Sequence, residues 1–319
     1  MNRPSPLRHR RPWLVSIAIV LFVAACAAGS GDLGGVATPP PTGGSSPDVP
    51  TAVPTAAASS PITSPVTLPD ATPSGSPVGT TTVRTYFFLG SFTDNAGLAP
   101  VERDIPKTQA VGAASIEALL AGPIEPELET SPAMYTSIPE GTRFLGLQIS
   151  SGVATVNLSS EFEAGGDSIS VSGRIAQVVY TLTQFPTVDG VRFEFDGLQP
   201  KGAFIGAFSR ADYTAFLPAI FVDRPAWGGT LGAPARVTGM ANVFEATFRI
   251  AILDTSGTVL VDQRAMATCG SGCWGTFDVT LSYHVAKAQS GTLRVYDRSA
   301  KDGSPENVTE YPVTLTPGG

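Results

Sequence analysis

The spacing of apolar residues changes partway along the chain, and the first folded half, residues 82–200, mixes helices with strands. The clearest helix has one apolar stripe with steps of four, three, four and three residues, formed by Val171, Ile175, Val178, Leu182 and Phe185. Such a stripe is the core-facing side of a helix, and Pro186 ends it. A shorter helix is predicted between Thr108, which can cap its start, and Gly122-Pro123 at its end.

Short β-rich runs accompany these helices. The alternation is clearest where Val191, Phe193 and Phe195 are separated by charged residues, as in a half-buried strand. Turn-forming residues follow at Asp196-Gly197, and Ser151-Gly152 supply a hairpin turn earlier in the chain. The predicted strands of this half are residues 82–89, 143–149, 153–158 and 191–195.

From about residue 218 the helical period disappears, and short alternating runs separated by turn residues replace it. One run places apolar side chains at every second position, at Phe244, Ala246, Phe248, Ile250 and Ile252. Further runs lie at residues 236–240, 258–261, 277–283, 292–296 and 307–316. About seven strands at this spacing are typical of a β-sandwich. We therefore expect an α+β protein with a mixed α/β domain over residues 82–200, an interdomain linker over 201–217 and an all-β sandwich over 218–319.

The first residues have the pattern of a bacterial lipoprotein signal peptide. Four arginines precede a short apolar run from Trp13 to Val23, and Ala24-Ala25-Cys26 follow. The run is too short to cross a bilayer core of about 30 Å as a helix. We predict that residues 1–25 are removed, that Cys26 is lipidated, and that the protein is extracytoplasmic and anchored to the cell membrane by this lipid. An ordinary signal peptide followed by an unrelated cysteine is the alternative.

Residues 26–81 are predicted to be a disordered linker. They are dominated by Pro, Thr, Ser, Ala and Gly, and they contain no aromatic residue with which to build a core. An extended polyproline conformation would reach ~170 Å, whereas a flexible coil of this length averages ~40 Å. Either length would lift a folded domain clear of a membrane. Low-complexity sequence without a spacing role is the alternative.

The charge of the chain excludes some partners. Its formal net charge is −7, and removal of residues 1–25 would take away four arginines and no acidic residue, which leaves −11. A negative field repels phosphate backbones, so we expect no nucleic-acid partner.

Cys269 and Cys273 enclose three small residues in the predicted sandwich. In an oxidising compartment this spacing favours a local disulfide, which would stabilise the fold by about 2 kcal/mol. A zinc site would need further Cys or His ligands nearby, and a thiol-exchange site would be expected to have a tighter C-x-x-C pair. We expect no metal and no cofactor.

Candidate catalytic groups are few. His284 is the only imidazole left after removal of residues 1–25, and it follows a strand with no evident partner. Glu161, Glu163 and Asp167 precede a helix, where acidic side chains commonly stabilise the helix dipole. Hydrolysis by two of these carboxylates is the alternative. We expect a protein that is not an enzyme.

Several motifs, in the right order, resemble the GerMN domain of sporulation and spore-germination proteins. They are residues 98–103 (LAPVER), 118–123 (ALLAGP), 137–142 (SIPEGT), 152–159 (GVATVNLS) and 180–185 (YTLTQF). The later segment, with residues 274–277 (WGTF) and 299–304 (SAKDGS), resembles the immunoglobulin-like domain that accompanies GerMN in bacterial spore-germination proteins. The resemblance implies a GerMN-like α/β domain followed by an immunoglobulin-like sandwich, in an extracytoplasmic protein without established catalytic residues. The pair of cysteines at 269 and 273 departs from the glycine-rich turn expected there.

Two classes of function fit these observations. The first is a non-catalytic envelope module that docks or assembles a protein partner outside the membrane, in a sporulation- or germination-related role. The second is a cell-wall glycan-binding module that stacks sugars on exposed aromatic rings. Trp274 begins a strand and is expected in the core, so Trp227, in a Gly-rich turn, is the better candidate for a binding surface.

Overall fold

The computed structural model describes residues 79–90 and 97–318. The predicted signal peptide, the lipidation site Cys26 and nearly all of the predicted linker lie outside these residues. In the described part of the chain, no helix combines the length and the hydrophobicity that a membrane crossing requires.

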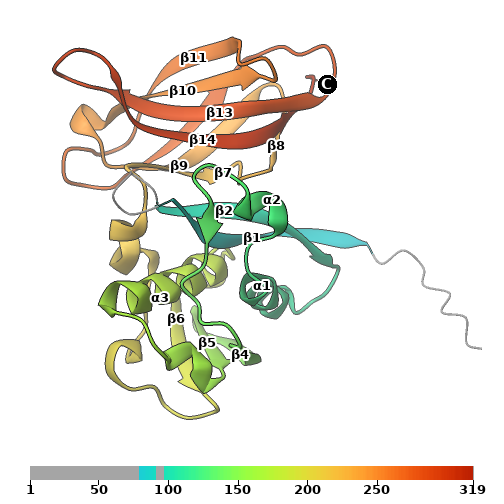
Figure 1. Cartoon of the computed structure of the whole chain (residues 1–319), viewed down its shortest axis with the longest axis vertical. Helices are drawn as coiled ribbons and strands as arrows, with labels where there is room; N and C mark the ends of the chain where they lie inside the picture. Colours follow the sequence, from blue (N-terminus) through green and yellow to red (C-terminus); the bar gives the residue numbers. More distant parts are fainter. Residues whose placement is uncertain (1–78, 91–96, 319) are drawn as a thin grey trace, which may run out of the picture. The chain divides into compact units, whose positions relative to one another are not determined.

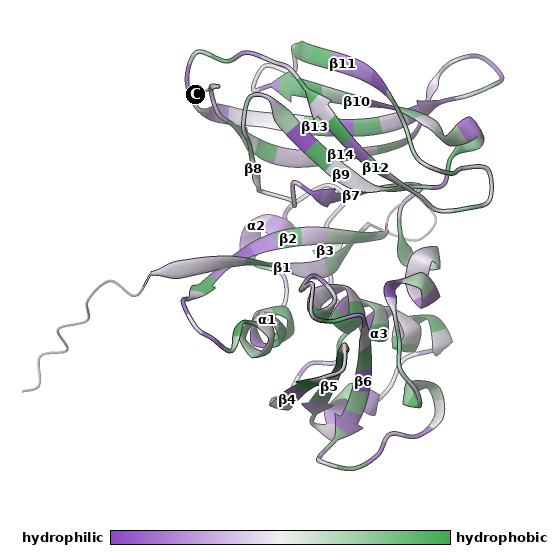
Figure 2. Ribbon diagram, turned by 180° about the vertical axis from the view of Figure 1, so that it is seen from behind, coloured by the Kyte–Doolittle hydropathy of each residue, from purple (hydrophilic) through white to green (hydrophobic). Residues whose placement is uncertain are grey.

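The first domain has helices between two three-stranded sheets. One sheet has the order β2-β1-β3 and the other has the order β4-β5-β6. Helices α1 and α3 contact each other, and both contact β1 of the first sheet (Figures 1 and 2). In the second sheet, α1 contacts β4 and α3 contacts β6. The strands are β1 (Thr80–Leu89), β2 (Gly97–Pro106), β3 (Met134–Tyr135), β4 (Phe144–Ser150), β5 (Val153–Leu158) and β6 (Gly190–Phe195). The helices are α1 (Val111–Leu120), α2 (Glu125–Leu128), α3 (Ser168–Leu182) and the 3-10 turn η1 (Ser160–Glu163).

Helix α3 forms where its apolar stripe predicts it. The Asp167 carboxylate caps the helix by accepting a hydrogen bond from the Ser170 backbone N–H at 2.8 Å. Ile175, Val178 and Leu182 are buried in the core of the first domain, and the helix ends before Phe185. Helix α1 starts three residues after Thr108, whose hydroxyl accepts a hydrogen bond from the Ala110 N–H.

Residues 201–217 are not a plain linker. They form two 3-10 segments, η2 (Gly202–Phe204) and η3 (Arg210–Phe216). Phe204, Tyr213 and Leu217 are buried in the same hydrophobic cluster as the first-domain helices. Three large side chains from this connecting segment therefore contribute to the first core.

The second domain is a sandwich of two sheets. One has the order β11-β10-β13-β14-β8 and the other has the order β12-β9-β7 (Figure 1). A separate hydrophobic cluster lies between the sheets, with Phe248, Ile250 and Leu281 among its buried members. The strands are β7 (Ile220–Arg224), β8 (Thr230–Leu231), β9 (Ala235–Ala241), β10 (Thr247–Asp254), β11 (Val259–Met266), β12 (Gly275–Leu281), β13 (Gln289–Arg298) and β14 (Pro305–Leu315). The expected α+β fold class is confirmed.

One predicted strand begins later than expected. The alternating pattern from Phe244 to Ile252 predicts a single strand, but residues Phe244–Ala246 form a 3-10 turn, η4, and β10 begins at Thr247. Glu245 and Ala246 both have positive φ angles, of 52° and 56°. This backbone conformation leaves the Phe244 side chain 67% exposed, not paired into the core.

Candidate functional site at the domain junction

Strand β7 contributes to both hydrophobic cores because successive side chains of a strand point to opposite faces. Ile220 and Val222 belong to the sandwich cluster. Phe221, which is 1% exposed, belongs to the first-domain cluster instead. The strand also contacts β2 of the first domain. The two domains are therefore joined through a packed strand.

Asp223, the next residue of β7 on the first-domain face, is held by three side chains of that domain. Its carboxylate pairs with the guanidinium groups of Arg84, at 3.1 Å, and Arg210, at 3.2 Å. The Tyr86 hydroxyl donates a hydrogen bond to the same carboxylate at 2.7 Å. Arg210 also donates to the Tyr86 oxygen at 3.0 Å, and its guanidinium lies over the rings of Tyr86 and Tyr180.

The charges in this network reinforce one another. Burial acts to raise the pKa of Asp223, but the positive charges of Arg210 and Arg84, together with hydrogen bonds from Tyr86 and Arg210, outweigh it, and the pKa is lowered. Burial is the main cause that raises the pKa of Tyr86, so its hydroxyl keeps its proton and donates it to Asp223. The carboxylate is therefore fixed as an anion with complementary partners, which is a structural role.

Trp227 lies in the turn after β7 and contacts both domains. Its backbone N–H donates to the Pro100 carbonyl of β2 at 2.8 Å, and the next N–H, of Gly228, donates to the Pro312 carbonyl of β14 at 2.9 Å. The indole ring is half-buried and meets the Tyr311 ring edge-on, with 6.1 Å between centroids. Its side chain packs against both hydrophobic clusters.

A cavity of about 700 Å³ opens beside this turn. Leu98 and Ala99 of β2 form one wall, whereas Trp227, Val308 and Pro312 supply apolar surface from the sandwich. The only carboxylate among its described lining residues is Glu310, which pairs with Arg294 at 2.6 Å. A mainly apolar wall with few polar groups is typical of a binding site for an apolar or amphipathic ligand, such as a peptide.

One polar group in the cavity wall has no partner in the described part of the chain. Thr309 is 8% exposed and lines the cavity, and its hydroxyl oxygen makes no hydrogen bond to described residues. Buried hydroxyls are usually hydrogen-bonded, so this one is an exception within the fold.

The histidine considered as catalytic lies in the other domain from the acidic residues, two of which are engaged in local contacts. Asp167 caps α3, and the hydrogen bond from the Ser170 backbone N–H is the main cause that lowers its pKa. Glu161 pairs with Arg143 at 3.6 Å, with side-chain exposures of 43% for Glu161 and 64% for Arg143. Glu163 and His284 are exposed, and His284 follows β12 in the other domain. In the residues that the structure describes, no three Asp, Glu, His or Cys side chains are grouped as metal ligands.

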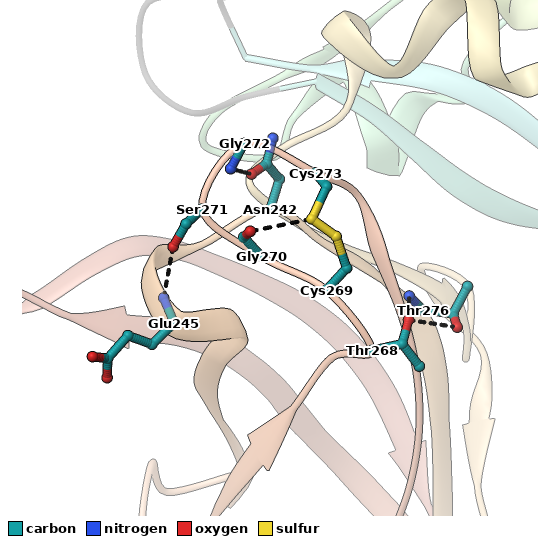
Figure 3. The surroundings of a disulfide bond; sticks show 9 residues. All are labelled: Asn242, Glu245, Thr268, Cys269, Gly270, Ser271, Gly272, Cys273 and Thr276. Carbon is teal, nitrogen blue, oxygen red and sulfur yellow. Dashed lines mark hydrogen bonds between the residues drawn. A yellow bond between two sulfur atoms is a disulfide. The ribbon is translucent and has the colours of Figure 1, made fainter.

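Cys269 and Cys273 are joined by a disulfide in the loop before β12 (Figure 3). Trp274, the next residue, is half-buried and packs against the first-domain cluster, not the sandwich cluster. Neither the disulfide nor Trp274 lines the cavity at Trp227.

Sequence reasoning selected Trp227 as a candidate for a binding surface, which stays a prediction, and missed Asp223 and its partners. Arg84 and Tyr86 lie within β1, in which residues 83–89 are all buried, and Asp223 follows three apolar residues in β7. A charge within an apolar strand was the available signal, because a buried charge requires a partner of opposite sign.

Two family matches now identify the domains. Residues 84–201 match the family described as "Sporulation and spore germination", and residues 219–304 match the "Immunoglobulin-like domain of bacterial spore germination". The first domain is therefore similar to the first of these families and the second domain to the other, and neither match alone spans half of the chain.

Solved structures to which parts of this chain are similar include GerMN domains. The first GerMN domain of the sporulation protein GerM from Bacillus subtilis is 21% identical, with a TM-score of 0.32, over 40% of this chain and 92% of that one. The tandem GerMN domains of the same protein are 16% identical, with a TM-score of 0.33, over 75% of this chain and 62% of that one. A predicted lipoprotein from Clostridium perfringens is 19% identical, with a TM-score of 0.30, over 44% of this chain and 95% of that one. No curated protein gave a significant match.

Proposed function

We propose that this chain is a non-catalytic, lipid-anchored protein of the cell envelope that docks another envelope protein outside the membrane. The observation that carries the proposal is the cavity at Trp227, whose apolar walls come from both domains. Apolar and aromatic residues that line a concave surface are the usual anchors of protein interactions. The two germination-related domain families support a role in sporulation or germination.

The absence of enzymatic activity is part of the same proposal. The two matched families are germination domains and not known enzyme families. The candidate acids are occupied, Asp167 by its helix cap and Glu161 by Arg143, and His284 lies in the other domain. The membrane anchor is proposed from Cys26 alone.

The docking role is tested by site-specific crosslinking in the protein's own cells. A photo-reactive amino acid at Val308, which lines the cavity and is 45% exposed, should capture one partner reproducibly. Val308→Glu should then abolish recovery of that partner. The matched control is Val259→Glu, an apolar residue on β11 with similar exposure, 51%, which should leave recovery unchanged. Equal recovery by the two variants would exclude the cavity as the docking site.

Cell-wall glycan binding is a second candidate, because the Trp227 ring lines the cavity and aromatic rings stack on sugars. Purified wall fragments should then bind the isolated protein, change the Trp227 fluorescence and lose affinity in Trp227→Leu. Binding of this kind, without a protein partner, would favour the glycan alternative.

A further inference from the structure

A second surface lies on the sandwich, at the turn η4, away from the cavity at Trp227, with which it shares no lining residue. Phe244 is the large apolar residue that this turn exposes. Single exposed apolar residues are common on protein surfaces and need no explanation. Phe244 differs because the turn that presents it has an unusual backbone and is fixed by a separate loop.

The backbone of η4 is held in a conformation that residues with side chains rarely adopt. Glu245 and Ala246 are both left-handed, although neither is glycine. Ser271, from the loop before β12, fixes them, because its hydroxyl accepts a hydrogen bond from the Glu245 N–H at 2.9 Å (Figure 3). The Ser271 N–H donates to the Val243 carbonyl, also at 2.9 Å. Such conformations persist only where the surroundings enforce them, and they concentrate at functional sites.

The disulfide closes the loop that makes these contacts. Cys269 and Cys273 bracket Ser271, and the Gly272 N–H donates to the Asn242 side chain at 2.9 Å (Figure 3). A Cβ atom on Gly270 would overlap with the backbone of Ala246. The loop and the turn therefore fit together closely, and Phe244 is held outward by a pre-organised support.

Beside Phe244 is a cavity of about 320 Å³ that three arginines line. Arg249 is paired with Asp262 at 2.8 Å. Arg264 and Arg298 are exposed and donate to neutral oxygens, the Thr247 hydroxyl and the Gly303 carbonyl. Neither of these two forms an ion pair with a carboxylate of the described residues, so both guanidinium groups are available to an anion.

The same cavity wall contains two acidic residues, Glu245 and Asp297. Asp297 is buried and accepts hydrogen bonds from the Asn307 amide, so its carboxylate is engaged within the fold. Arg264 and Arg298 are therefore exposed donors without an ion pair among the described residues, beside one exposed acidic residue, Glu245.

We propose that Phe244, Arg264 and Arg298 form a docking surface for an acidic segment of a protein partner. An apolar side chain of the segment packs on the Phe244 ring, and its carboxylates pair with Arg264 and Arg298. The pairing of an aromatic anchor with charge-assisted hydrogen bonds is a common design of interaction surfaces. This surface shares no lining residue with the cavity at Trp227, so it is independent of the function proposed above.

A phosphate-rich wall polymer is the competing ligand for two free arginines. It would use the guanidinium groups but would gain nothing from an exposed phenyl ring. The rigid presentation of Phe244 therefore favours a protein segment, and the role of Phe244 distinguishes the two ligands experimentally.

The test pans a displayed library of random peptides against the chain without its signal peptide, immobilised through the Cys26 thiol. We expect the selected peptides to be rich in Asp and Glu around one apolar residue. Phe244→Ala and the double variant Arg264→Ala/Arg298→Ala should each weaken their binding about 10-fold or more. Raising the salt from about 50 to about 300 mM should also weaken it, because exposed charges are screened.

Two controls make the outcome decisive. Arg192→Ala removes an exposed arginine on β6 of the first domain and should leave binding unchanged. Removal of the disulfide by Cys269→Ser/Cys273→Ser should weaken binding a few-fold, because the turn loses pre-organisation. Selected peptides without acidic residues, or peptides that bind Phe244→Ala as tightly as the original chain, would overturn the proposal. Binding of poly(glycerol phosphate) that is insensitive to Phe244→Ala would overturn it in favour of the polymer.

Discussion

The replacement Asp223→Ala tests whether the junction network stabilises the two domains. It leaves the guanidinium groups of Arg84 and Arg210, with side-chain exposures of 9% and 26%, without their shared carboxylate. Removing one partner of a buried ion pair costs about 3–5 kcal/mol. Because Asp223 keeps 21% of its side chain exposed, we expect a loss of about 2–3 kcal/mol in the free energy of unfolding. For a protein of this size that loss lowers Tm by roughly 4–12 °C.

The assay is urea and thermal unfolding of the folded region, followed by circular dichroism. The matched control is Asp278→Ala, which breaks a pair with Arg236 in which both side chains are more than half exposed. Exposed pairs contribute little, so this control should change the stability only slightly. An equal loss in both variants would refute the argument that burial and the two arginines make Asp223 important.

The pH dependence of the stability lost in a second variant, Asp223→Asn, provides a further check. The pKa of Asp223 is lower in the folded protein than in the unfolded chain. The stabilisation that the ionised Asp223 carboxylate gives to the folded protein is therefore fully present above the pKa of Asp in the unfolded chain, about 3.9. This stabilisation is lost as the pH falls through the lower pKa of Asp223 in the folded protein. The stability difference between the original chain and Asp223→Asn should be constant between about pH 5 and pH 7 and should shrink below about pH 4. A difference that grew on acidification would contradict the assigned direction.

Three further predictions concern other parts of the chain. Cys26→Ser should release the protein from the membrane fraction, because the lipid thioether cannot form, and retention in the high-salt pellet would contradict the lipid anchor. A fragment of residues 79–217 should melt at a higher temperature than one of residues 82–200, because it keeps Phe204, Tyr213 and Leu217 in the core; equal melting temperatures would show that these contacts add nothing. Incubation of purified protein with cell wall should release no muropeptides, as judged by mass spectrometry, and release that stops in Glu161→Gln or Glu163→Gln would establish an enzyme.

The elements that were predictable are those whose signal is local. Helix α3 follows from a stripe of apolar residues within fifteen positions and from the cap at Asp167, both of which lie in the helix or beside it. Strands β9 and β13 follow in the same way from short alternating runs. Local periodicity depends on neighbours in the sequence, so the chain carries it without help from distant contacts.

The elements that were not predictable depend on distant residues. The turn at Phe244 continues an alternating pattern, and it departs from a strand because Ser271, 26 positions beyond Glu245, bonds to its backbone. Strand β7 has an apolar beginning that does not indicate which core each face enters. The cavity at Trp227 needs β2 and β14, which are separated by about two hundred residues. Such contacts leave no periodic trace in the sequence.

The alternation of β7 has a consequence for exchanging the two domains between related proteins. A recombined protein must keep the register of this strand, because a shift by one position would move Asp223 into the sandwich interior and Val222 towards Arg84 and Arg210. An insertion between Leu217 and Ile220 would be tolerated only if its length preserved that register. A sandwich grafted onto this first domain must therefore have an acidic residue at the position of Asp223 in its first strand. Without that residue, the first domain must lack arginines at positions 84 and 210. Natural shuffling of these modules is expected to retain this strand with both of its neighbours.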